Sequence, residues 1–257
     1  MRRLVIWLCA AIVTIAGTVL FFCPAAWLAP LIEQQTGGRI TLGDAQGSIW
    51  RGSAFIGAAP SGSDPVTPLL PGRFAWRLSP AALLGVLDAT LENPAALGQP
   101  VQITGSWSQW QVSPSMVRLP AERLAALGAP LNTIAPTGEM RLTWGALQLA
   151  RHGRQVDLVG TMQLDLLDIA SRLSPIKPLG AYRMQMAWQG QTAQMQLTSL
   201  QGPMLLSGSG SLANGRLRFS GRAQAAKGQE ERLANLLNLL GQRRQEGGSN
   251  YIALELK

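Results

Sequence analysis

The ionisable side chains of this chain offer little from which a catalytic or metal site could be built. Histidine occurs once, as His152, inside the polar stretch 151–154. A catalytic triad or a metal site that needs histidine could use only this one residue, and we expect His152 to be solvated. Asp157, Asp165 and Asp168 raise the question of a calcium site or an acid pair. Their spacing matches no calcium loop, so we expect the last two to decorate the exposed side of a short helix.

A glycine-rich segment is the second chemical candidate. Gly208-x-Gly210-x-x-Ala213 looks like a degenerate dinucleotide-binding fingerprint. That fingerprint needs a helix directly after it, because the helix N-terminus holds the pyrophosphate. Asn214-Gly215 and a strand-like segment follow instead. The sequence therefore predicts a bulge or bend in a sheet here, and we expect no cofactor, no metal and no enzymatic activity.

Basic and sulfur-containing side chains point to contacts rather than to chemistry. Arg216, Arg218 and Arg222 form a modest basic set, of which the first two share one face of a predicted strand. They predict a solvated outer face, with anionic lipid or a protein partner as the alternative. The methionines at 184, 186 and 195 are predicted core residues, although methionine-rich faces also adapt to varied hydrophobic ligands.

An unbroken apolar run from Leu4 to Cys23 opens the chain, with two arginines before it and Pro24 behind it. At about 1.5 Å per residue, a helix of this length crosses a hydrocarbon core of roughly 30 Å. The run carries no charge, and its hydrophobic residues surround the helix, as in a segment solvated by lipid. It predicts a transmembrane helix over residues 4–23. The predicted anchor residues are Leu4, Trp7, Phe21, Phe22 and Trp27.

A cleaved signal peptide is the alternative interpretation of this run. Signal peptides have a shorter apolar region and small residues flanking the cut. The best candidate cut, after Ala25, has Pro24 just before it and the bulky Trp27 soon after it, so the sequence favours an uncleaved anchor. Arg2 and Arg3 are the only charges ahead of the run, and positive residues prefer the cytoplasmic side. We therefore expect residues 1–3 in the cytoplasm and the rest of the chain beyond the anchor to be exported.

The composition of the exported part suits a bacterial periplasm. Both cysteines, Cys9 and Cys23, lie in the apolar run, so the exported part has neither a disulfide scaffold nor a thiolate metal site. The 257 residues carry a formal net charge of +8. That excess favours anionic headgroups or an acidic protein partner, whereas an exported domain rarely meets nucleic acid.

After the anchor, hydrophobic spacing predicts a helical stalk over residues 24–38 and then a change to period two. Alternating strands fill residues 39–257, and Asn214-Gly215 is a strong hairpin signal. Short helices are expected after Ser79-Pro80, over 121–127 and over 167–173, and an amphipathic helix over Glu230 to Leu240. The predicted fold is mainly β: one transmembrane helix, then a periplasmic, antiparallel, curved β-meander with a few short helices and one C-terminal amphipathic helix.

Several short motifs, taken in order, resemble protein N of the bacterial type II secretion system. They are Gly47-Ser48-Ile49-Trp50-Arg51-Gly52, Pro178-Leu179-Gly180, Gly202-Pro203-Met204-Leu205-Leu206-Ser207-Gly208 and Leu236-Leu237-Asn238-Leu239-Leu240-Gly241, after an anchor and stalk. The candidate motif or interaction residues are Trp50, Gly52, Gly180, Tyr182, Gly202, Pro203, Gly208, Arg216, Arg218 and Gly241. The resemblance implies an inner-membrane component that serves the export of folded proteins, with no catalytic residues.

Two functions compete at this point. The first is an accessory or assembly subunit of the secretion machinery, with sheet edges and a basic face that contact other periplasmic subunits. The second is a lipid-binding or lipid-transfer module, in which long alternating strands curl into a trough with an apolar lining for acyl chains. Membrane lipids are partners in both, and nucleic acid is a partner in neither.

Overall fold

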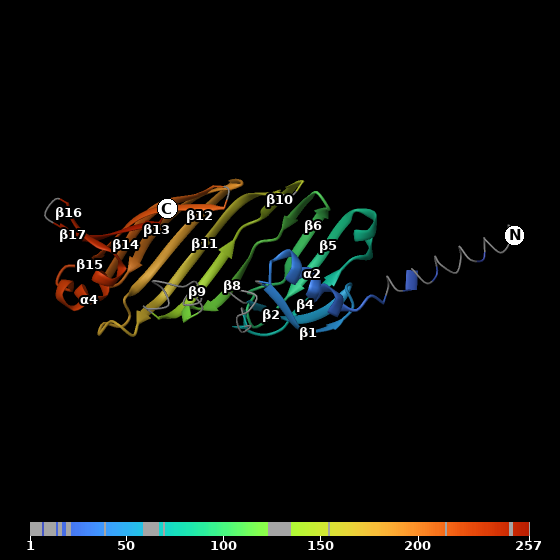
Figure 1. Ribbon diagram of the computed structural model, residues 1–257, viewed down its shortest axis with the longest axis horizontal. Coiled ribbons are helices and arrows are strands. Elements are labelled where there is room, and N and C mark those ends of the chain that lie inside the picture. Colours follow the sequence, from blue (N-terminus) through green and yellow to red (C-terminus); the bar gives the residue numbers. More distant parts are fainter. Residues whose placement is uncertain are drawn as a thin grey trace. The chain divides into compact units, whose positions relative to one another are not determined.

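The computed structural model describes residues 22–38, 40–58, 67–68, 70–122, 135–153, 155–213, 215–246 and 249–256, together with residues 7, 14, 17 and 18. The chain divides into two compact units, Met1–Ala95 and Ala96–Lys257. Antiparallel strands are the main regular structure of each unit, which confirms the prediction of a mainly β chain (Figure 1).

Most of the predicted anchor, including Leu4 and Phe21, lies outside the described residues. Within the part that is described, no helix has the length and hydropathy needed to cross a membrane. Trp7, Phe22 and Trp27 are described and are 76%, 70% and 57% exposed. The transmembrane helix therefore stays a prediction.

The first unit begins with the predicted stalk, which is helical as expected. A 3-10 turn, η1 (Ala25–Trp27), runs into α2 (Leu28–Gln35). Gly37 and Gly38 follow with φ of 62° and 79°, the left-handed region that ends helices and favours glycine. The sequence signal for the end of this helix is thus confirmed.

Five strands form the sheet of the first unit: β1 (Ile40–Gly47), β2 (Arg51–Ala58), β3 (Thr67–Pro68), β4 (Phe74–Leu78) and β5 (Val86–Glu92). β2 pairs with β1 on one side and with β3 and β4 on the other, and β5 pairs with β4. A 3-10 turn, η2 (Pro80–Leu84), joins β4 to β5. Ser79 caps it, because its Oγ accepts a hydrogen bond from the Ala81 N–H, and Gly85 ends it with a φ of 90°.

The second unit is a meander in which strands pair mostly in chain order. Its elements are β6 (Val101–Ser106), β7 (Gln109–Val112), β8 (Ser115–Pro120), β9 (Pro136–Trp144), β10 (Leu147–His152), β11 (Gln155–Ser171), β12 (Gly180–Gly190), β13 (Thr192–Gln201), β14 (Met204–Ala213), β15 (Arg216–Ala225), α4 (Glu230–Leu240), β16 (Gln242–Glu246) and β17 (Ser249–Leu256). β11 is long enough to pair with β10 near its start, with β9 near its end and with β12 along its other edge. After α4, β17 pairs with β15, and β16 pairs with β17.

The register of these strands gives the sheet of the second unit one apolar and one polar face. One row of directly paired residues reads Trp144, Met162, Met186, Met195, Gly210, Phe219 and Leu256. The neighbouring row, on the opposite face, reads Thr143, Gln163, Gln185, Gln196, Ser209, Ser220 and Glu255. Strict alternation therefore separates the two chemistries across seven strands.

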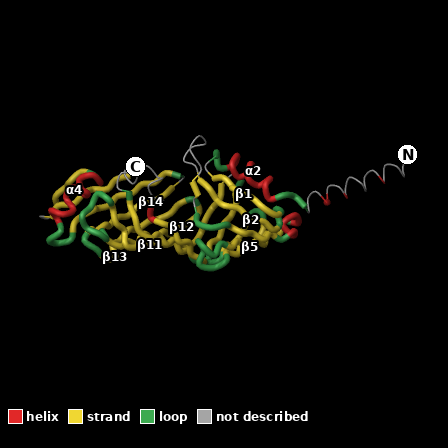
Figure 2. The backbone as a smooth tube through the Cα atoms, turned by 90° about the horizontal axis from the view of Figure 1, so that it is seen from below, coloured by secondary structure: helices red, strands yellow, loops and turns green. Residues whose placement is uncertain are grey.

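Helix α4 covers one end of the apolar face. Its Leu233, Leu236 and Leu237 are buried in a cluster with Tyr182, Leu197, Met204, Ala223 and Ile252. The predicted amphipathic helix is thus confirmed. Figure 2 shows α4 in red at one end of the strands of this unit. Of the three predicted core methionines, Met184 packs against this cluster, whereas Met186 and Met195 lie further along the apolar face and are half-buried.

The predicted helix over 167–173 is wrong, because β11 continues to Ser171. The strand contains a bulge at this point, where Asp168 has a φ of 50° and the pairing with both β9 and β12 shifts register. Leu166 faces the core before the bulge and Ile169 is buried after it. The bulge sets two core positions three residues apart, at i and i+3, which imitates a helical spacing. The predicted helix over 121–127 falls largely outside the described residues.

Candidate functional site

The motif 47–52 forms the turn between β1 and β2, and we call it the entry turn because it binds the backbone at Cys23 and Pro24, where the apolar run ends. The Ile49 N–H donates to the Cys23 carbonyl at 3.0 Å. Pro24 and Ser48 form an antiparallel bridge beside it. Ala25, the next residue, is fully buried. The first backbone after the apolar run is thus fixed to the sheet of the first unit.

Trp50 and Gly52 have different tasks in this turn. Trp50 is buried, and its carbonyl accepts a hydrogen bond from the Leu78 N–H at 2.7 Å, which ties the entry turn to β4. Gly52 lies against the indole ring of Trp76, where a Cβ would stand 2.4 Å from Cζ2. The Trp76 Nε1–H in turn donates to the Ile49 carbonyl at 3.1 Å. Only glycine leaves room for that ring at position 52.

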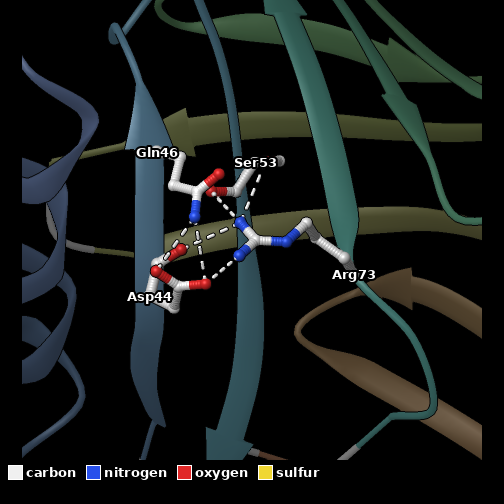
Figure 3. A network of polar contacts seen from close by, with 4 residues as sticks. All are labelled: Asp44, Gln46, Ser53 and Arg73. Atoms are coloured by element: carbon white, nitrogen blue, oxygen red, sulfur yellow. Dashed lines mark hydrogen bonds and ion pairs between the residues drawn. The ribbon is translucent and has the colours of Figure 1, made fainter.

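An arginine crosses the strands beside the entry turn (Figure 3). Arg73 Nη1 donates to the Asp44 carbonyl at 2.9 Å and to Ser53 Oγ at 3.0 Å, and Nη2 forms an ion pair with the Asp44 carboxylate. Gln46 Nε2 donates to the same carboxylate at 3.1 Å. The guanidinium also lies 4.7 Å from the ring centroid of Phe55. This network fixes a bulge in β1, where Asp44 has a φ of 49°.

A second group of predicted residues meets between β12 and the segment before β14. At Gly202, whose φ is 119°, a Cβ would stand 2.3 Å from the Gly180 Cα. The Tyr182 hydroxyl donates to the Met204 carbonyl at 3.0 Å, and burial raises the pKa of Tyr182. Pro203 accepts a hydrogen bond from the Ala226 N–H at 2.7 Å, just before α4. These residues form a packed backbone crossing.

The structure corrects the interpretation of the glycine-rich segment in β14. Pairing with β15 runs without a register shift, so there is no bulge. The ring of Phe219 lies over Gly208, Gly210 and Gly221, where added Cβ atoms would stand 2.6 to 2.9 Å from it. Small residues here make room for one aromatic ring on the apolar face.

The basic set of β15 lies on the opposite, polar face. Arg218 is paired directly with Ser211 of β14. Both Arg216 and Arg218 line an open depression of about 1210 Å³, whose wall includes Ser209 and Ser211 of the polar face and Leu217 and Phe219 of the apolar face. Arg222 shares their strand face, and its guanidinium lies 4.9 Å from the ring centroid of Tyr251. The outer face expected from the sequence is therefore present, and it combines guanidinium groups with hydroxyls.

Asp165 is a buried charge that sequence reasoning placed wrongly on an exposed helix. It lies in β11 between Arg183 of β12 and Arg141 of β9, and Arg183 Nε donates to its Oδ1 at 2.7 Å. Burial by itself raises the pKa of Asp165, but the bonds from Arg183 and Gln163 and the two arginine charges outweigh it, so the pKa lies below its ordinary value. A strand register would have predicted this pair, because directly opposed residues share a face.

Other candidate residues carry no visible chemistry. His152 is exposed at the end of β10, with Nδ1 3.2 Å from Asp157 Oδ2. Gly241 lies against the β17 backbone, where a Cβ would stand 2.6 Å from the Ala253 carbonyl oxygen. Among the described residues, no group of three or more His, Cys, Asp or Glu side chains could hold a metal ion.

One protein family matches this chain over most of its length. No curated protein and no solved structure matches the chain. Residues 38–250 match the family described as Type II secretion system (T2SS), protein N. That match spans the entry turn, the backbone crossing at Gly180 and Gly202, the β15 arginines and Gly241, and it leaves out the apolar run. The chain therefore belongs to the type II secretion system protein N family.

Proposed function

We propose that this protein is an accessory or assembly component of the type II secretion machinery, anchored in the bacterial inner membrane, that acts through protein contacts in the periplasm. The match over residues 38–250 carries this proposal, because membership of the family makes the chain a component of that secretion system. The apolar run from Leu4 to Cys23 supports the anchor, and the two arginines before it support a cytoplasmic N-terminus.

Two features of the second unit support a role in protein contacts. Arg216 and Arg218 are exposed on the polar face beside serine hydroxyls, a surface that suits an acidic partner. β16, among the described strands, pairs with β17 alone. An edge of this kind offers backbone groups for strand addition by another subunit. From these two surface features we propose binding rather than catalysis.

Deletion and complementation test this proposal. A strain lacking the chain should release less of its secreted enzymes into the medium, and the wild-type gene should restore release. The double variant Arg216→Ser with Arg218→Ser should restore it only partly. The matched control, Arg151→Ser with Arg172→Ser, removes the same charge from two other exposed positions and should restore it fully. Undiminished export in the deletion strain, with normal assembly of the outer-membrane pore, would count against the proposal.

The apolar face of the second unit favours a second candidate, a module that binds or transfers lipid. Trp144, Met162, Met186 and Met195 form a continuous row, and each is only half-buried. Flexible thioethers adapt to acyl chains of varied shape. Native mass spectrometry of the full chain, purified in a detergent, should then find a co-purifying lipid. Its loss in Met186→Gln, with retention in the polar-face control Gln185→Ala, would support this role. Absence of any bound lipid in the wild type would exclude it.

A further inference from the structure

Large apolar side chains project into solvent from the turn between β4 and β5. Leu83 and Leu84 of η2 are 56% and 86% exposed, and Val86, the first residue of β5, is 54% exposed. Ala82 in the same turn is 1% exposed and so faces the core of the first unit. A 3-10 helix advances about 120° per residue, so burial of Ala82 directs the next two side chains away from the sheet.

This apolar turn lies at the end of the sheet where the chain enters. The Ile49 N–H donates a hydrogen bond to the Cys23 carbonyl. The carbonyl of Trp50, which follows Ile49, accepts a hydrogen bond from the Leu78 N–H, and Leu78 lies two residues before the start of η2. The entry turn and η2 are therefore neighbouring turns at one end of the sheet. With strands about 4.8 Å apart, η2 starts roughly 10 Å from Cys23. Phe22 and Trp27, at 70% and 57% exposure, flank the same entry.

The turn is built to hold its shape. Ser79 caps η2 at its start, and Gly85 closes it in the left-handed conformation. The Ser79 N–H also donates to the Asp88 carbonyl at 2.8 Å, which closes the hairpin behind it. The exposed leucines are thus presented by a fixed turn, so little conformational entropy is lost when they are buried by a partner.

Two arginines lie directly behind the turn. Arg51 and Arg77 are opposed across β2 and β4. Like charges in directly opposed positions repel one another, and an anion between them removes that repulsion. Arg77 also reaches Glu92 at 3.3 Å, and Asp88 lines the same depression as both arginines. Apolar side chains at the tip with arginines behind them fit the order of layers in a bilayer, where phosphates lie outside the acyl chains.

We propose that η2 is a second membrane contact, in which Leu83, Leu84 and Val86 insert into the leaflet from which the apolar run emerges. The partner is the phospholipid surface itself, with its phosphates near Arg51 and Arg77. This contact rests on the proposed anchoring of residues 4–23. It would hold the first unit against the membrane, so that the entry turn sits at the lipid surface. Burial of each leucine should strengthen the contact about tenfold.

Spin labels on the full chain test the contact. Single cysteines at Leu84, Pro94 and Ile12 are introduced after Cys9→Ser and Cys23→Ser, and the protein is reconstituted in phosphatidylethanolamine and phosphatidylglycerol vesicles. Pro94 is exposed and follows β5 at its other end, about 20 Å from η2, so it serves as the aqueous reference. Collisions with oxygen, which concentrates in lipid, are compared with collisions with a water-soluble nickel chelate. We expect the label at 84 to lose nickel collisions and gain oxygen collisions relative to the label at 94.

The label at position 12 separates the two proposals. If it lies in lipid while 84 matches the aqueous reference, the anchor stands and the η2 contact is refuted. If position 12 is exposed to water, the anchor is refuted, and the η2 contact, which rests on that anchor, is refuted with it. A label at Leu83 repeats the reading at a second position of the turn, and agreement with 84 is required for the proposal to stand.

Discussion

The Tyr182 hydroxyl donates to the Met204 carbonyl at 3.0 Å, and both residues are buried. The bond joins β12 to the first residue of β14, across the crossing of Gly180 and Gly202. The bond therefore holds the start of β12 against the start of β14, at the end of the sheet that α4 covers. The bond joins two of the segments whose sequences resemble the type II secretion system protein N family.

Removal of that hydroxyl should destabilise the protein. Tyr182→Phe leaves the Met204 carbonyl without this donor, which costs about 1–3 kcal/mol. Chemical unfolding of the full chain in detergent, followed by tryptophan fluorescence, measures the change. Tyr251→Phe is the matched control, because its ring can still contact Arg222, and it should stay within about 0.5 kcal/mol of the wild type. Equal stability of the two variants would show that the bond contributes nothing.

The same tyrosine predicts a stability change at alkaline pH. Burial raises its pKa, so the folded state holds the phenolic proton more tightly than the unfolded state does. The resulting contribution is complete below the unfolded pKa of about 10 and is lost as pH rises above it. Stability measured from pH 9 to pH 11 should fall more steeply in the wild type than in Tyr182→Phe. Parallel curves for the two proteins would contradict this.

Asp165 predicts a change of stability at the acidic end of the pH range. Its pKa is lowered in the folded state, so its contribution is present above the unfolded value of about 3.9 and is lost as pH falls through the folded value. Asp165→Asn also leaves Arg183 without its charged partner and should cost about 1.5–3 kcal/mol at pH 7. The stability difference between variant and wild type should therefore shrink as the pH falls below about 4.

A control separates this effect from general loss of charge. Asp88→Asn removes an exposed carboxylate and should leave the free energy of unfolding at pH 7 within about 0.5 kcal/mol of the wild type. A difference between Asp165→Asn and wild type that stays constant down to pH 2 would mean that the ion pair with Arg183 has no part in acid unfolding.

Gly52 should tolerate no side chain. A Cβ there would stand 2.4 Å from the Trp76 ring and 2.8 Å from the Gln46 and Ser48 carbonyl oxygens, so Gly52→Ala must move the indole or the backbone. Overpacking of this kind costs about 1–3 kcal/mol. Gly43→Ala in β1 is the matched control, because nothing lies closer than 3.9 Å to its added Cβ. Thermal unfolding of both variants should show a loss for Gly52→Ala alone.

Patterns of local spacing predicted most of the strands, the stalk and α4, because each needs only its own residues to define a face. What they could not predict is which strand lies next to which. Asp165 looked like an exposed carboxylate until β9 and β12 brought an arginine to each side of it. The bulge at Asp168 is a second case, since pairing on both edges of β11 overrides a spacing that indicates a helix on its own.

The candidate residues also depend on contacts that local spacing does not reveal. Trp50, Gly52, Gly180 and Gly202 could be named from a family resemblance, but their reason for being there lies in contacts between distant segments. The sequence alone does not show where the Trp76 ring lies, and it is this ring that excludes a Cβ at position 52. The network around Arg73 had no signal in the sequence, because the three residues that contact the guanidinium, Asp44, Ser53 and Phe55, are spread over β1 and β2.

Arg73 should not be replaceable by lysine. Its guanidinium contacts the Asp44 carbonyl, the Asp44 carboxylate and Ser53 at once, and it stacks on Phe55, whereas a lysine ammonium presents a compact charge without that planar fork. Arg73→Lys should lower the free energy of unfolding by about 1–2 kcal/mol. Arg77→Lys, in β4 just after Arg73 and with one exposed contact to Glu92, should change it by less than about 0.5 kcal/mol. Because Asp44 holds the β1 bulge in a left-handed conformation, we also expect faster hydrogen exchange at the backbone amides of residues 44–46 in Arg73→Lys. Unchanged exchange there, together with wild-type stability, would mean that the bulge keeps its shape without the arginine.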